Sequence, residues 1–76
     1  MATISLPELR QIIEVALDRD PGDISLESRL YEQLGFDSIG MVALVVEIQR
    51  RFGVRIPELE VPNLRTVQDI IVAIEA

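Results

Sequence analysis

The sequence predicts an all-α fold, a small bundle of three main helices and one short helix. Three segments carry apolar residues at helical spacing, and Gly- and Pro-containing turns separate them. The chain has 76 residues, 49% of them hydrophobic, and no Cys or His, so disulfides and thiolate or imidazole metal sites are excluded. We therefore expect residues 1–76 to form a single domain that apolar packing alone holds together.

The first helix is predicted to begin after Ser5. The run Ser5-Leu6-Pro7-Glu8 matches a capping box, with Pro7 in the first turn, where its missing N–H costs nothing. The turn residues 20–23 are expected to end this helix. Its apolar stripe comprises Leu6, Leu9, Ile13, Ala16 and Leu17.

A long connection is predicted over residues 21–37. Leu30–Leu34 favours one helical turn, with Gly35 at its C-terminal end. A connection of this length in so small a domain is more often functional than not. Five apolar residues are expected to anchor it to the core: Ile24, Leu26, Leu30, Leu34 and Phe36.

The second helix is predicted from Ser38 to Phe52, with Gly53 as its stop, and it has two apolar faces. The predicted core face consists of Met41, Leu44, Val45, Ile48 and Phe52. The opposite face consists of Ile39, Val42, Ala43 and Val46. Neighbouring segments could cover both faces, but so small a bundle can seldom do this, and we favour an exposed strip kept for partner proteins.

The C-terminal third is predicted to contain the short helix and the last main helix. Pro57 can start a short turn whose length Pro62 limits. The last helix is expected to begin at Thr66, with Asp69 at its third position. Its stripe comprises Val67, Ile70, Ile71 and Ile74. Residues 54–56 are β-like in propensity, but one short run cannot make a sheet.

Charge and residue usage exclude several functions. With 13 acidic residues, 7 Arg and no Lys, the net charge of −6 disfavours nucleic acid and anionic membranes as partners. The longest apolar run, residues 41–46, is far too short to span a membrane. Without His, Cys or Lys we expect no catalytic residues, and Asp18, Asp20 and Asp23 are expected to form a solvated loop rather than an acid/base pair. A monomer in the cytoplasm is the default expectation.

Ser38 stands where the connection meets the second helix, and two interpretations are open. Ser and Asp are both favoured N-caps, so Asp37-Ser38 taken alone predicts a cap. A phosphodiester on Ser38 would equally be favoured, because a helix N-terminus offers unpaired N–H groups and the positive end of its dipole. Asp37 would then help to hold a divalent cation during attachment.

Three motifs, taken in order, resemble those of the acyl and peptidyl carrier proteins. Residues 34–39 (L-G-F-D-S-I) are similar to the L-G-x-D-S-L attachment motif. Residues 52–57 (F-G-V-R-I-P) resemble the F-x-x-x-I-P signature, and residues 66–69 (T-V-Q-D) the T-V-x-D/E start of the last helix. The resemblance implies that Ser38 bears 4′-phosphopantetheine, transferred from coenzyme A by a phosphopantetheinyl transferase with Mg²⁺.

The same resemblance implies a carrier that does no chemistry itself. Acyl or aminoacyl groups would travel as thioesters on the arm, between an acyl- or aminoacyl-loading enzyme and a downstream synthase or transferase. The strip Ile39, Val42, Ala43 and Val46 matches positions that such carriers present to partners. One departure is that residues 38–56 carry a single acid, Glu47, against three Arg, whereas fatty-acid carriers bear several acids there. We therefore expect a discrete carrier in a specialised polyketide or nonribosomal-type pathway, such as antibiotic biosynthesis.

Two alternatives stay open. The second helix also resembles that of D-alanyl carrier proteins, which use D-S-F-G before a similar apolar run, so a D-alanyl or other aminoacyl carrier is an alternative. A protein of another class would be a non-covalent helical interaction module, in which Ser38 is only a cap.

Overall fold

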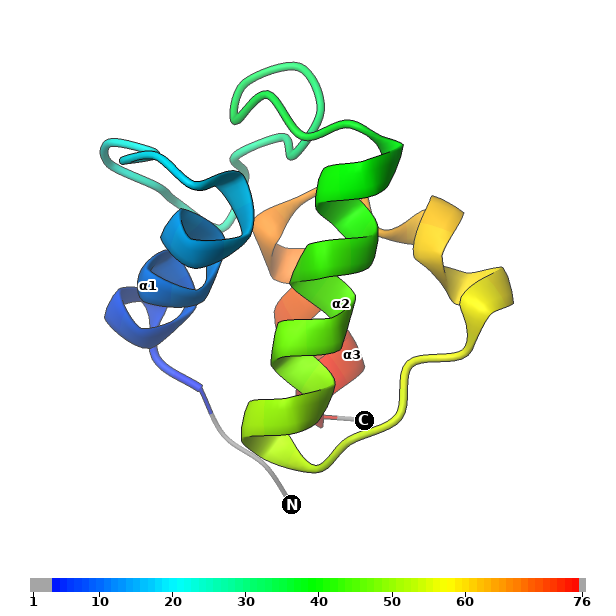
Figure 1. Cartoon of the computed structure of the whole chain (residues 1–76). Coiled ribbons are helices and arrows are strands. Elements are labelled where there is room, and N and C mark those ends of the chain that lie inside the picture. Colours follow the sequence, from blue (N-terminus) through cyan, green and yellow to red (C-terminus); the bar gives the residue numbers. More distant parts are fainter. Residues whose placement is uncertain (1–3, 76) are drawn as a thin grey trace.

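The structure, a computed structural model, describes residues 4–75 as three α-helices and one 3₁₀-helix (Figure 1). In chain order these are α1 (Leu6–Leu17), α2 (Ser38–Phe52), η1 (Glu58–Asn63) and α3 (Val67–Glu75). Residues 4–75 contain no strand, only an isolated antiparallel bridge between Arg29 and Thr66. The predicted all-α bundle of three main helices and one short helix is confirmed. No helix in this part of the chain is long and apolar enough to cross a membrane.

Helix α1 begins as its sequence predicts and ends earlier. The Glu8 amide donates to Ser5 Oγ at 3.3 Å, and the Ser5 amide donates to Glu8 Oε1 at 3.5 Å, which completes the capping box. The helix ends at Leu17, so the expectation that residues 20–23 end it was wrong. Asp18 ends it instead by taking left-handed backbone angles (φ 57°), which Asp tolerates better than most residues, and its N–H donates to the Val15 carbonyl.

Helix α2 has the predicted bounds, and Figure 1 shows it at the front of the molecule with α3 behind it. Gly53 closes it at φ 66°, where its N–H donates to the Gln49 carbonyl. Met41, Leu44, Val45 and Ile48 are buried and Phe52 is half-buried against the core, so the predicted core face is confirmed. All four residues of the opposite strip are exposed, and the alternative in which neighbouring segments cover both faces is wrong.

One apolar core joins the helices and the long connection. The fully buried Leu9 and Ile13 come from α1, and Ile70 and Ile74 come from α3. Burial of side chains of this size contributes roughly 1.5–3 kcal/mol each. Helix η1 has no buried residue, and its Val61 is only half-buried against the core. It is therefore a peripheral element.

Helix α3 begins with a reciprocal cap. The Asp69 amide donates to Thr66 Oγ1 at 3.3 Å, while Asp69 Oδ2 accepts from the amides of Arg65 (2.9 Å) and Thr66 (3.1 Å). The Arg65 hydrogen bond is the main reason that the pKa of Asp69 lies below its ordinary value, with desolvation opposing it and the Thr66 bonds and the Arg65 charge assisting. The predicted capping arrangement of Thr66 and Asp69 is confirmed, and the helix itself begins one residue later than predicted, at Val67.

The connection between α1 and α2 is held to the start of α3 by backbone hydrogen bonds. The Leu30 amide donates to the Arg65 carbonyl at 2.9 Å, and the Gln68 amide donates to the Leu26 carbonyl at 3.0 Å. Leu30, Leu34 and Phe36 are buried and Ile24 is half-buried, as predicted. The prediction for Leu26 was wrong: the residue is 38% exposed, and its carbonyl accepts the hydrogen bond from the start of α3.

Candidate functional site

Ser38 is the first residue of α2, where the long connection reaches the helix at the top of Figure 1. The N-cap is its neighbour: Asp37 Oδ1 accepts from the Gly40 amide at 2.7 Å, and the Asp37 carbonyl accepts from the Met41 amide at 2.9 Å. Ser38 is exposed, and its hydroxyl makes no hydrogen bond to any of residues 4–75. The interpretation of Ser38 as the cap was therefore wrong, and its hydroxyl is available to an outside reactant.

Packing beneath the site fixes where α2 begins. The Phe36 ring is buried, and its amide donates to the Leu30 carbonyl at 2.9 Å. Gly40 lies directly over this ring: a Cβ at Gly40 would stand 3.0 Å from Phe36 Cδ1 and 3.2 Å from Asp37 Oδ1. Glycine in the first turn thus lets helix, ring and cap approach closely, and a larger residue there would have to displace the Phe36 ring or the Asp37 carboxylate by a few tenths of an ångström.

Arg19, just beyond α1, holds the chain immediately before the site. Its Nη2 donates to the Leu34 carbonyl at 2.5 Å. The next residue, Gly35, has φ 81°, and a Cβ there would clash with Arg19 Nη2. This contact could not be predicted from the sequence, because an Arg in a polar turn carries no signal of a partner 15 residues away.

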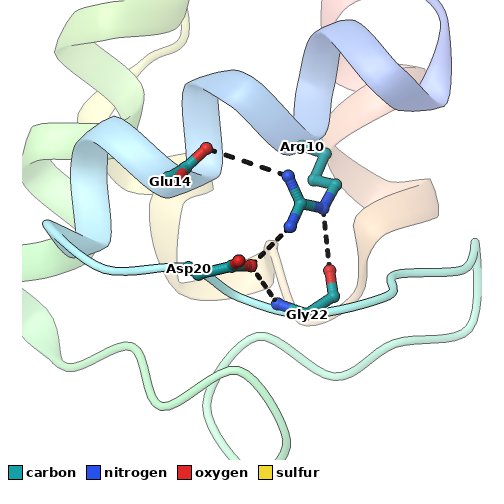
Figure 2. A network of polar contacts seen from close by, with 4 residues as sticks. All are labelled: Arg10, Glu14, Asp20 and Gly22. Carbon is teal, nitrogen blue, oxygen red and sulfur yellow. Dashed lines mark hydrogen bonds and ion pairs between the residues drawn. The ribbon is translucent and has the colours of Figure 1, made fainter.

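A second arginine holds the beginning of the same connection (Figure 2). Arg10 on α1 donates through Nε to the Gly22 carbonyl at 2.9 Å and also binds Asp20, whose Oδ1 accepts from the Gly22 amide at 2.8 Å. Glu14 lies 3.8 Å from Arg10 Nη1. Asp18, Asp20 and Asp23 are all exposed, so the predicted solvated loop is confirmed, and Asp20 has a structural partner within it.

The donors around Ser38 suit a phosphodiester. The amides of Ser38 and Ile39 have no acceptor among residues 4–75, since the Asp37 groups take those of Gly40 and Met41. Two open N–H groups and the positive end of a 15-residue helix favour an anionic acceptor without a Lys or Arg clamp. Asp37 Oδ2 has no hydrogen bond within the described residues, and it is the free oxygen that a divalent cation would need.

The exposed strip on α2 starts directly at this site. Ile39 is 82% exposed, Val42 59% and Val46 45%, and Ala43 is exposed between them. The predicted strip and Ser38 therefore belong to one continuous surface. This surface offers a nucleophile-bearing helix end and apolar area, and residues 4–75 contain no group of three or more carboxylates that could hold a metal ion.

Known proteins similar to this chain are acyl carrier proteins. Residues 7–74 match the family model described as the phosphopantetheine attachment site. The chain is 37% identical over 68 residues to the acyl carrier protein of Campylobacter concisus, which covers 90% of this chain and 88% of the relative. It is 35% identical over 74 residues to an anthracycline acyl carrier protein of Streptomyces sp. (strain C5), covering 95% and 88%.

Solved structures of acyl carrier proteins have the same fold as this chain. A putative acyl carrier protein from Mycobacterium tuberculosis superposes with a TM-score of 0.79 at 28% identity, covering 88% of this chain and 89% of that one. Hexanoyl acyl carrier protein from the actinorhodin polyketide synthase of Streptomyces coelicolor has a TM-score of 0.79 at 25% identity, covering 97% and 91%.

Proposed function

The chain belongs to the phosphopantetheine-attachment family of acyl carrier proteins, and on this premise we propose that Ser38 is the residue that bears the arm. As a member of that family the protein is a carrier and not an enzyme, and its prosthetic group is covalent 4′-phosphopantetheine. When bound, the arm supplies the terminal thiol that this Cys-free chain lacks. That thiol holds an acyl group as a thioester.

The observation that carries the assignment of Ser38 is that this residue is exposed at the first position of α2 and that its hydroxyl has no hydrogen bond to any of residues 4–75. Asp37 does the capping, so modification of Ser38 removes no contact of the fold. The open amides of Ser38 and Ile39 would receive the phosphate. Asp37 supports attachment, in this proposal, by offering Oδ2 to the Mg²⁺ that a phosphopantetheinyl transferase uses.

We further propose a discrete carrier in a specialised polyketide or nonribosomal-type pathway, including antibiotic biosynthesis. The anthracycline and actinorhodin carriers among its relatives support the polyketide assignment. The shortage of acids on α2 also supports a dedicated pathway, because partners that select acidic carriers would be steered poorly. Its partners would be a phosphopantetheinyl transferase, a loading enzyme and a downstream synthase or transferase.

The proposal places residues 1–76 in one monomeric carrier domain that works in the cytoplasm, where coenzyme A and the transferase are available. The strip of Ile39, Val42, Ala43 and Val46 is its partner-binding surface. An apolar strip next to the attachment residue brings a docked enzyme close to the arm.

Intact-mass spectrometry tests the attachment. Co-expression with a broad-range phosphopantetheinyl transferase should add one phosphopantetheinyl group to the wild type and none to Ser38→Ala. Ser25→Ala removes another exposed serine hydroxyl and should leave modification unchanged. An unmodified wild type would refute the carrier assignment, and a modified Ser38→Ala would refute the site.

Two further measurements separate the alternatives. If the protein were a non-covalent module, a folded Ser38→Ala variant would retain pathway activity, whereas the proposal predicts complete loss. The mass of the natively expressed protein identifies the cargo. A D-alanyl or long saturated fatty-acyl group on the arm would contradict the proposed pathway.

A further inference from the structure

The exposed face of α2 changes from apolar to basic along its length. Ile39, Ala43, Val46 and Arg50 are separated by four, three and four residues, so they lie in one row on the helix surface. The Arg50 side chain is 74% exposed. The row that begins beside Ser38 with apolar side chains therefore ends with a guanidinium group.

A single carboxylate serves two arginines at this end. Glu47 Oε1 lies 3.2 Å from Arg50 Nη1, and Glu47 Oε2 lies 3.1 Å from Arg51 Nε. The Glu47 side chain is 19% exposed, against 74% for Arg50 and 44% for Arg51. Both oxygens of the acid are thus engaged and largely covered. Arg51 lies on the side of α2 that faces Glu14 and Asp18 of the α1 region, while Arg50, on the row of the strip, faces outward.

From this arrangement we propose that α2 docks a partner protein whose surface is an apolar groove that ends in a carboxylate opposite Arg50. The inference rests on the proposed carrier function and adds the charge of the partner. The Arg50 guanidinium has five N–H donors and gives one to Glu47, so paired donors remain for a carboxylate of the partner. A partner with Lys or Arg at this place would meet like charge when Ile39, Val42 and Val46 are covered.

A purely helix-stabilising role for the two arginines makes a different prediction. Basic residues in the last turn complement the helix dipole and pair with Glu47 at i+3 and i+4. If this were their only role, replacing either arginine would change only the free energy of unfolding. It would leave the choice of partner unaffected by replacement of Arg50.

A charge-swap experiment tests the proposal. The probe is a malonyl-transferring acyltransferase whose docking surface is lined by Lys and Arg, together with a variant of that enzyme in which these residues are Glu. We expect the wild-type carrier to be loaded at least about tenfold faster, in kcat/KM at low salt, by the acidic version, and Arg50→Glu to lose or reverse this preference. The preference should shrink as salt is raised.

Arg29→Glu is the matched control. It makes the same change in net charge at a side chain that is 67% exposed, lies outside α2 and is paired only at 3.8 Å with Glu32. We expect it to keep the wild-type preference. Equal losses for Arg29→Glu and Arg50→Glu would overturn the proposal, since net charge alone would then explain them, and so would faster loading of the wild type by the basic enzyme. Circular dichroism of each variant verifies the helix content.

The docking result does not depend on the arm. Titration of the unmodified carrier with each acyltransferase, followed by backbone amide shifts, should perturb residues 39–51 more strongly with the acidic version. Shifts confined to other elements would refute the docking face. Failure of arm attachment at Ser38 would overturn the proposed function separately, because this titration uses the chain without the arm.

Discussion

Alanine replacement of Asp37 and of Ser38, one at a time, should show that the helix cap and the attachment point are different residues: Asp37→Ala should lower stability, and Ser38→Ala should abolish modification at unchanged stability. Asp37 supplies the side-chain oxygen that accepts from the Gly40 amide at 2.7 Å, so Asp37→Ala leaves an orphan N–H in the first turn. Loss of an N-cap costs typically about 1 kcal/mol, within a range of about 0.5–2. For a domain of this size that corresponds to a decrease in Tm of roughly 4–8 °C.

Ser38→Ala should change the free energy of unfolding by no more than about 0.5 kcal/mol. Its hydroxyl is exposed and makes no hydrogen bond within residues 4–75, and Ala is a better helix former than Ser. The same variant should lose all arm attachment. Urea unfolding followed by circular dichroism measures the first effect, and intact mass after co-expression with the transferase measures the second.

Asp37→Asn separates the cap from the proposed cation ligand. Asn caps about as well as Asp, so stability should stay near the wild-type value, while attachment should slow because the carboxylate is gone. A loss of 1 kcal/mol or more in Ser38→Ala, with Asp37→Ala unchanged, would show that the serine hydroxyl caps the helix and would refute the reasoning. A normal attachment rate in Asp37→Asn would remove Asp37 from the attachment machinery.

Three further predictions concern the loop, the last helix and the strip. Gly35→Ala should destabilise the protein by about 2 kcal/mol, because positive φ strains an L-residue and the new Cβ would displace the Arg19 guanidinium. Gly22 also has positive φ, but no atom lies within 4 Å of a Cβ built there, so Gly22→Ala should cost about 1 kcal/mol. Equal losses of unfolding free energy for the two variants in urea would contradict the clash at Gly35. The pKa of Asp69 is lowered in the fold, so the stabilising contribution of its carboxylate is present above the ordinary pKa near 3.8 and is lost as pH falls through the lowered pKa. Asp69→Asn should therefore flatten the acid side of the curve of unfolding free energy against pH, and an unchanged curve would contradict this role of Asp69. Val42→Asp and Val46→Asp should impair cargo transfer far more than unfolding free energy, and a large stability loss in both would mean that the strip is core.

The bounds of the helices could be predicted closely where capping chemistry is local. Ser5 and Glu8 are three residues apart, as are Thr66 and Asp69, and Gly53 needs no partner to take positive φ. Apolar spacing also predicted both faces of α2, because the periodicity of a helix determines which side chains share a face. The exposure of the strip could also be predicted, because a bundle of 76 residues has too few elements to cover both faces of one helix.

The path of the long connection could not be predicted in the same way. Arg19 reaches Leu34, and Leu26 bonds to the start of α3 through its carbonyl. These contacts join residues far apart in sequence, and a backbone carbonyl is the acceptor in each of them. Neither polarity nor periodicity of the side chains encodes such partners.

By itself, the sequence determined the helical architecture, the two faces of α2 and the motif around Ser38, because these depend on spacing and on residues within one or two turns of each other. Only the tertiary structure decided that Asp37 caps α2 and leaves the Ser38 hydroxyl unbonded. Both residues have suitable side-chain oxygens, so local chemistry could not choose between them. The choice depends on where the chain turns into the helix, and the buried Phe36 ring under Gly40 fixes that point.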